Sequence, residues 1–255
     1  MASKGKDLYK STIVLVVLIL IWAGLSMAGV FSSFVFPGPA RVWKAFVGML
    51  VSGELLQNMI ASLGRVLIGF MISFVLAFIL GILACLRPKS DPYYRPILEF
   101  LRHVPPMSLI PLLILWCGIG EASKIIIIVL TAFFPIFMNT ESGLKECDKK
   151  LLEVGETLHM SVREQFLKIR LPAAFPSILV GMQIGLGYSW RAIVGAEMIA
   201  ASSGLGYMIL DAQALSRSDK VLVGIIMIGI LGLLMDAGFN ALIKKMTHGK
   251  EAAND

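Results

Sequence analysis

One apolar run dominates this chain: between residues 58 and 86, Arg65 is the only charged side chain. A helix of about 20 predominantly apolar residues is long enough to cross the hydrocarbon core of a bilayer. Five other stretches approach this pattern, so six spans are expected, at residues 13–30, 58–86, 104–119, 124–139, 176–200 and 221–243. The sequence therefore predicts an all-α membrane protein with a single transmembrane domain over residues 1–255.

The stretch 104–119 is the least regular of the six. It contains Pro105, Pro106 and Pro111, and each proline removes a backbone hydrogen-bond donor. Breaks of this kind are tolerated at membrane depth only where neighbouring protein covers them. We therefore expect a broken helix there.

Composition supports the membrane assignment. The chain is 57% hydrophobic and 16% charged, whereas soluble domains are closer to half apolar and a quarter charged. A net charge of +6 would suggest nucleic acid in a soluble protein, but cytoplasmic loops of membrane proteins gather Lys and Arg. No nucleic-acid partner is expected. Three widely spaced cysteines, Cys85, Cys117 and Cys147, form no disulfide or metal-site pattern.

The distribution of basic residues predicts the orientation. With the N-terminus inside, the outer segments hold only Arg41, Lys44, Lys124, Arg217 and Lys220, and most other Lys and Arg residues fall on inner segments. This asymmetry places both termini in the cytoplasm. The outer loop after the first span contains a possible interfacial helix, residues 39–50, with an apolar stripe.

A charged segment, residues 151–172, separates two apolar runs on the inner side. Its apolar residues recur at helical spacing and form one face: Leu151, Val154, Leu158, Val162, Phe166 and Ile169. Asp148 is positioned to cap the first helix, Ser161 and Glu164 fit a capping box for a second, and the helix is expected to end before Pro172. The face suits either a lipid surface or a protein groove, and the balanced charge favours the groove.

The segment also carries a motif. Glu153, Val154 and Gly155 stand where permease subunits of binding-protein-dependent ABC importers have E-A-A, His159 stands at that family's glycine, and the later positions match at Ser161, Phe166, Leu171 and Pro172. Further stretches are similar to the sulfonate, nitrate and taurine branch: residues 61–65, 105–106, 115–121, 133–135, 195–199 and 203–206. With His159 in place of glycine, either the bend moves to Gly155 or Ser161 starts the second helix without a glycine. We favour Ser161.

The resemblance implies a role for this segment. Residues 141–175, here called the coupling loop, would dock into a cytoplasmic ATPase through Glu153, Gly155, Ser161, Glu164, Phe166, Leu171 and Pro172. It also implies a homodimer in a prokaryotic inner membrane, two ATPase copies, and an extracytoplasmic protein that delivers a small anion such as a sulfonate, taurine or nitrate. The chain lacks G-x-x-x-x-G-K-[ST], so ATP and Mg would be bound by the partner. We therefore expect a transport subunit and not an enzyme.

Four ionisable residues fall inside expected spans, where charge is costly and marks candidate functional sites: Arg65, Arg191, Glu197 and Asp236. From a rise of about 1.5 Å per residue, Arg65 and Glu197 are shallow enough on the outer side to pair. Arg191 is expected near mid-membrane, either facing an anionic substrate or bonded to backbone carbonyls at a helix break. Asp236 has no evident partner.

Two other functional classes remain open at this point. A stand-alone secondary transporter or channel would use intramembrane carboxylates to carry protons, and a membrane scaffold would only recruit a soluble partner. The absence of an evident inverted repeat and the presence of the docking segment count against the first. Buried arginines count against the second. We find no catalytic set and no metal-ligand spacing in the sequence.

Overall fold

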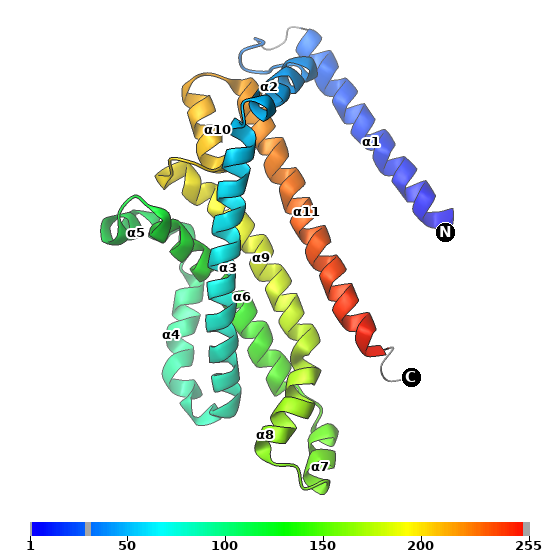
Figure 1. The fold of residues 1–255 in the computed structure, drawn as a ribbon, viewed down its shortest axis with the longest axis vertical. Helices are drawn as coiled ribbons and strands as arrows, with labels where there is room; N and C mark the ends of the chain where they lie inside the picture. Colours follow the sequence, from blue (N-terminus) through cyan, green and yellow to red (C-terminus); the bar gives the residue numbers. More distant parts are fainter. Residues whose placement is uncertain (1, 29–31, 252–255) are drawn as a thin grey trace.

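The computed structural model describes residues 2–28 and 32–251, and within these ranges the chain is helical (Figure 1). Residues 29–30, the end of the first expected span, lie outside the described residues. The α-helices are α1 (Ala2–Met27), α2 (Pro39–Val51), α3 (Glu54–Leu86), α4 (Asp91–His103), α5 (Ile110–Cys117), α6 (Glu121–Lys145), α7 (Lys149–Thr157), α8 (Val162–Gln165), α9 (Leu171–Ala200), α10 (Leu205–Ala214) and α11 (Ser218–Glu251). Shorter elements are the 3-10 helices η1 (Pro88–Ser90) and η2 (Pro106–Leu109) and the π-helix η3 (Phe166–Arg170).

Four segments are long and apolar enough to cross a membrane: Glu54–Leu86, Glu121–Lys145, Val162–Ala200 and Ser218–Met246. They contain the expected spans 58–86, 124–139, 176–200 and 221–243. In α1 the apolar helix found among the described residues is Val16–Met27, which is shorter than a full span. The six-span count and the cytoplasmic position of both termini therefore stay predictions.

The expected span over 104–119 is replaced by part of a bent unit. Pro88–His103 and Pro106–Cys117 meet at 87°. The bend falls at Val104 and Pro105, which are both extended, with ψ of 116° and 122°, because each precedes a proline that disfavours helix. Helix α4 lies between two expected spans. It tolerates Pro92 because this residue occupies its first turn, where no amide donor is needed. Together the two pieces form a broken fifth crossing or a re-entrant loop.

The centre of the molecule is α6, which packs against α3 on one side and α9 on the other. Gly181 and Gly185 of α9 face α6 so closely that an added Cβ would lie 2.6 Å from Asn139 Cβ and 2.9 Å from Ile136 Cγ1, respectively. The Gly-x-x-x-Gly spacing thus serves close helix packing within this chain.

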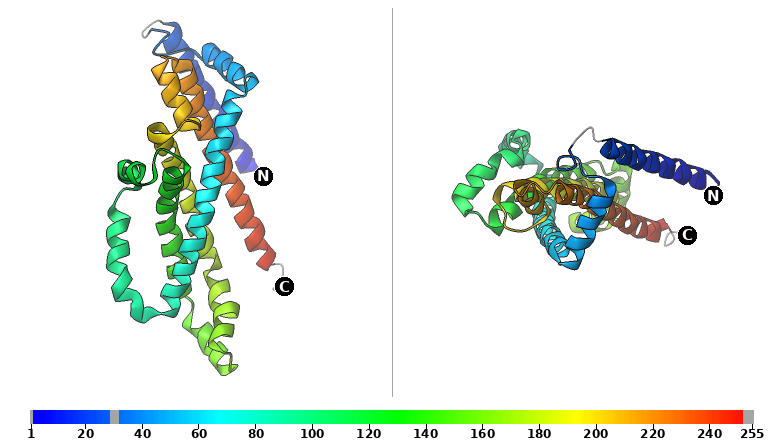
Figure 2. Two further views of the ribbon diagram at one scale, coloured as in Figure 1. Left: turned by 60° about the vertical axis from the view of Figure 1, so that its left-hand side comes forward. Right: turned by 90° about the horizontal axis from the view of Figure 1, so that it is seen from above.

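The two ends of the bundle differ in character. Figure 1 places α7 and α8 beyond one end and α2 and α10 at the other, and Figure 2 shows α1 leaning away from the remaining helices. Helix α2 matches the expected helix at 39–50. Its Val42 and Met49 are buried, while Trp43 and Leu50 are exposed, so only part of its apolar stripe faces the protein and the rest is free to contact lipid.

We predict that Gly181→Leu separates α9 from α6 and destabilises the protein by about 1–3 kcal/mol, the usual cost of overpacking. The measurement is the thermal unfolding midpoint in detergent. Gly238→Leu is the matched control, because an added Cβ at Gly238 meets nothing within 4 Å. Equal midpoints for the two variants would contradict the close packing of α9 on α6.

Candidate coupling loop and intramembrane charges

Arg65 is the centre of an ionic cluster in which Arg65, Lys124 and Glu197 are buried and the side chain of Glu121 is 59% exposed. Its Nη1 donates to Glu197 Oε1 at 2.6 Å and to the Ser203 carbonyl at 2.7 Å. Its Nε and Nη2 donate to the two carboxylate oxygens of Glu121 at 2.7 and 2.9 Å, and Nη2 also donates to Ser203 Oγ. All five guanidinium donors are therefore used. The expected pairing of Arg65 with Glu197 is confirmed.

Glu197 is satisfied from several directions, as a buried carboxylate requires. The Ser62 hydroxyl lies within 2.9 Å of both of its oxygens, and the Gly206 amide donates to one of them at 3.1 Å. Gly204 has φ of +115°, and an added Cβ there would collide with the Glu197 carboxylate. The Ser-Gly-Leu-Gly stretch at 203–206 thus wraps the carboxylate, and only glycine fits at 204.

Sequence reasoning missed half of this cluster. Glu121 falls between two expected spans and Lys124 counts among the outer basic residues, but Lys124 Nζ lies 2.7 Å from Glu121 Oε1 and the Lys124 side chain is 3% exposed. The positive charges of Arg65 and Lys124 balance the negative charges of Glu121 and Glu197. The glutamate at the end of residues 115–121 was the available signal, since an acidic residue just before a span suits a buried arginine on a neighbouring helix.

The coupling loop folds as a helix pair. Asp148 Oδ1 accepts from the Lys150 amide at 2.9 Å and caps α7. Ser161 and Glu164 form both bonds of a capping box, which starts α8 as predicted. These bonds, first from the Ser161 amide and then from its hydroxyl, lower the pKa of Glu164. The turn itself falls at His159, with φ of +55°, a conformation that histidine adopts more readily than most residues.

Gly155 serves packing, and the bend does not fall there. A Cβ at Gly155 would lie 2.8 Å from Ile169 Cδ1 and 3.2 Å from Gln165 Cγ. The missing side chain lets α7 fold back onto the helical segment that follows the turn. Glu153 is exposed on α7.

The apolar face of the loop divides into two parts. Phe166 is half-buried and packs with Leu171 against a cluster that includes Leu144 and Ile178. The earlier part is exposed on this chain, with exposures of 48% to 79%: Leu151, Val154, Leu158 and Val162. We call these four residues the exposed stripe, and nothing in the described part of this chain covers them.

The helix does not end before Pro172, contrary to our expectation. Val162–Ala200 is one helical segment, in which the π-helix η3 precedes α9. The Leu171 amide bonds to the Phe166 carbonyl five residues back. Pro172 has no backbone N–H. It is tolerated because it lies in the first turn of α9, directly after this π turn.

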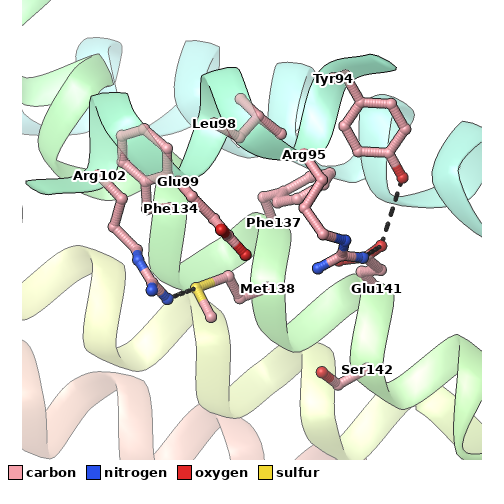
Figure 3. A pocket seen from close by; sticks show the side chains of 10 residues that line it. All are labelled: Tyr94, Arg95, Leu98, Glu99, Arg102, Phe134, Phe137, Met138, Glu141 and Ser142. Carbon is pink, nitrogen blue, oxygen red and sulfur yellow. Dashed lines mark hydrogen bonds and ion pairs between the residues drawn. The ribbon is translucent and has the colours of Figure 1, made fainter. Parts of the chain in front are cut away.

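A second polar cluster joins α4 to α6 around a cavity of about 110 Å³ (Figure 3). At one end Arg95 and Tyr94 point toward Glu141, with Arg95 Nη2 2.9 Å from Glu141 Oε1. At the other end Arg102 points toward Met138 Sδ. The sequence does not reveal this cluster, because residues 87–103 fall between two expected spans. Its effect is to fix α4 to α6 close to the start of the coupling loop.

Arg191 and Asp236 do not join the Arg65 cluster. Instead they line one cavity of about 400 Å³ between α9 and α11. Both residues are exposed on the isolated chain. The structure therefore brings together the two intramembrane charges for which the sequence offered no partner.

The architecture is that of a helical membrane permease. It aligns with the methionine ABC transporter MetNI in inward-facing form with a TM-score of 0.66 at 18% identity, covering 76% of this chain and 97% of that one, a likeness of fold. Residues 73–248 match the model of the binding-protein-dependent transport system inner membrane component, and the chain belongs to that family.

Curated relatives span nearly the whole chain. It is 40% identical to the "Putative aliphatic sulfonates transport permease protein SsuC" of Bacillus subtilis, over 90% of this chain and 83% of that one. It is 33% identical to the taurine transport system permease protein TauC of Escherichia coli, over 92% and 88%. It is 31% identical to the bicarbonate transport system permease protein CmpB of a Synechocystis strain, over 91% and 86%.

We predict that Arg65→Gln destabilises the protein by about 3–5 kcal/mol, because it leaves Glu197 buried without its charge partner. The thermal unfolding midpoint in detergent reports the change. Lys168→Gln is the control: it breaks an exposed pair with Glu164 at 3.2 Å and should cost less than about 1 kcal/mol. Equally small shifts in the two variants would show that the Arg65 cluster does not hold α3, α6 and α9 together.

Proposed function

We propose that this chain is the membrane-spanning subunit of an ATP-driven importer, in which two copies pair in a prokaryotic inner membrane. An extracytoplasmic binding protein delivers a small anion to their outer face. The observation that carries the proposal is the exposed stripe on a capped helix pair at one end of the bundle. The family membership and the transport functions printed for the relatives, for sulfonates, taurine and bicarbonate, support it.

The stripe explains how energy from ATP reaches the membrane. Four exposed apolar residues, on α7, at its C-terminal end and at the start of α8, suit the groove of a soluble partner, and the relatives' class of transporter uses an ATPase. ATP and Mg are bound by that ATPase. Closure of its dimer would displace α7 and α8 and, through the helical segment Val162–Ala200, the outer end of α9.

A stand-alone proton-coupled transporter is a weaker candidate. Such a mechanism needs intramembrane carboxylates that release and take up protons. Glu197 accepts bonds from Arg65, Ser62 and Gly206, so its carboxylate oxygens are already occupied by fixed partners. The Arg65 cluster is built as a fixed structural contact, which suits a subunit powered from outside.

We predict that uptake requires all the partners. Cells that lack their own sulfonate uptake are given the chain with or without its ATPase and binding protein, and the entry of labelled taurine, ethanesulfonate, nitrate and bicarbonate is measured. Transport of at least one anion is expected only with the full set. Uptake by this chain alone would overturn the importer proposal.

We predict that Leu158→Asp, on the exposed stripe, releases the ATPase from the detergent-solubilised complex, because a carboxylate in an apolar groove is costly to desolvate. Co-purification on an affinity tag is the measurement. Lys149→Gln changes the net charge by the same amount on the opposite, exposed face of α7 and should retain the ATPase. Full retention by Leu158→Asp would place the docking surface elsewhere.

A further inference from the structure

The cavity between α9 and α11 has an unusual lining. One cation, Arg191, and one carboxylate, Asp236, face a space of about 400 Å³, within the range of small-molecule sites. The only other polar side chain in the lining is Trp190, whose Nε1 already donates to the Ile228 carbonyl at 3.1 Å. The free polar groups of the cavity side chains are therefore two opposite charges.

The remainder of the cavity is apolar and kept open by glycine. Gly187 of α9 and Gly229 of α11 both line it, and an added Cβ at either would meet nothing within 4 Å. A solute with several hydroxyls would find few partners here. A compact solute with a charge at each end and a short hydrocarbon linker would find a partner for every group.

Within the described residues, Arg191 and Asp236 form no ion pair, although both lie on membrane-spanning helices. Arg65, Lys124 and Glu197 are all paired. A lone charge facing lipid at mid-membrane costs about 2.5–3.5 kcal/mol by insertion scales. This face is therefore unsuited to lipid and requires water, a solute or another protein surface.

We propose that this cavity binds the transported solute and that the solute is a zwitterion with an anionic group of the sulfonate type and an ammonium group. Arg191 binds the anionic end and Asp236 the ammonium end. The inference rests on the proposed function and replaces its small anion by a solute that carries an ammonium group as well as an anionic group. A simple anion would satisfy Arg191 and leave Asp236 without a partner, so the site discriminates between the two classes.

The test is direct binding to the purified permease–ATPase complex in nanodiscs, without binding protein. The probes are taurine, ethanesulfonate and ethylamine, which share the two-carbon unit and carry both charges, the anion alone or the cation alone. Taurine should bind at least about tenfold more tightly than either analogue, since hydrogen bonds to charged groups are the strong ones. Asp236→Asn should reduce taurine affinity to that of ethanesulfonate, and Arg191→Gln should weaken both sulfonates.

Asn240→Ala is the control, because Asn240 lies one turn beyond Asp236, bonds to Gln183 at 3.1 Å and does not line the cavity. It should bind taurine like the parent. Arg191→Lys retains the charge and should keep most of the affinity if Arg191→Gln fails to fold. Equal binding of taurine and ethanesulfonate, or unchanged taurine binding in Asp236→Asn, would overturn the proposal.

The charges could instead pair across two copies of this chain. In that case the variants would lower the dimer fraction in size-exclusion chromatography with light scattering, and the proposal would fall. Failure of the site and failure of the importer proposal are distinguishable. In the first, ATP-dependent uptake persists without selective taurine binding; in the second, uptake does not depend on the ATPase.

Discussion

The hydrocarbon core of a membrane offers no water, so the chain must satisfy its own backbone and charges. The Arg65 cluster meets this requirement most completely: five donors, two carboxylates and the backbone of residues 203–206 close on one another. It joins α3, the start of α6 and the end of α9. One largely buried set of contacts therefore fixes the ends of three helices.

The same constraint explains the irregular elements. The bend between α4 and α5 exposes backbone groups at prolines, and α5 rests on α6 and α9 through Ile110, Leu113, Ile127 and Ala196. Pro172 has no backbone N–H, and the helix continues through it by way of the π-helix η3, in which the Leu171 amide bonds to the Phe166 carbonyl. Each break in a helix thus coincides with protein contacts or a local change of hydrogen bonding.

The sequence was most informative where the signal is local. Apolar runs located α3, α6, α9 and α11, and short-range capping patterns placed the starts of α7 and α8, because caps depend on residues a few positions apart. The pairing of Arg65 with Glu197 followed from depth alone. Glu121 and Glu141 each pair with a lysine three or four residues away, but their arginine partners lie on other helices, more than 40 residues away along the chain, so helical periodicity and capping patterns do not reveal them.

Pro172 shows why a local rule can fail. Proline disfavours helix in the preceding residue, but packing of Phe166 and Leu171 against Leu144 and Ile178 favours a continuous helix over a turn. The departure from α-helical hydrogen bonding is confined to one π turn, Phe166–Arg170. Tertiary packing therefore decided the local conformation, as it commonly does when helical propensity and burial conflict.

Continuity through Pro172 has a mechanical consequence. Val162–Ala200 contains 39 residues, about 58 Å at the rise of an α-helix. Its N-terminal end carries the capping box beside the exposed stripe, its middle packs on α6 through Gly181 and Gly185, and its C-terminal part carries Arg191 and Glu197. A turn at Pro172 would uncouple these parts. A single helical segment instead joins the surface on which we place the ATPase to the cavity that we assign to the solute, and this segment packs tightly on α6 between the two.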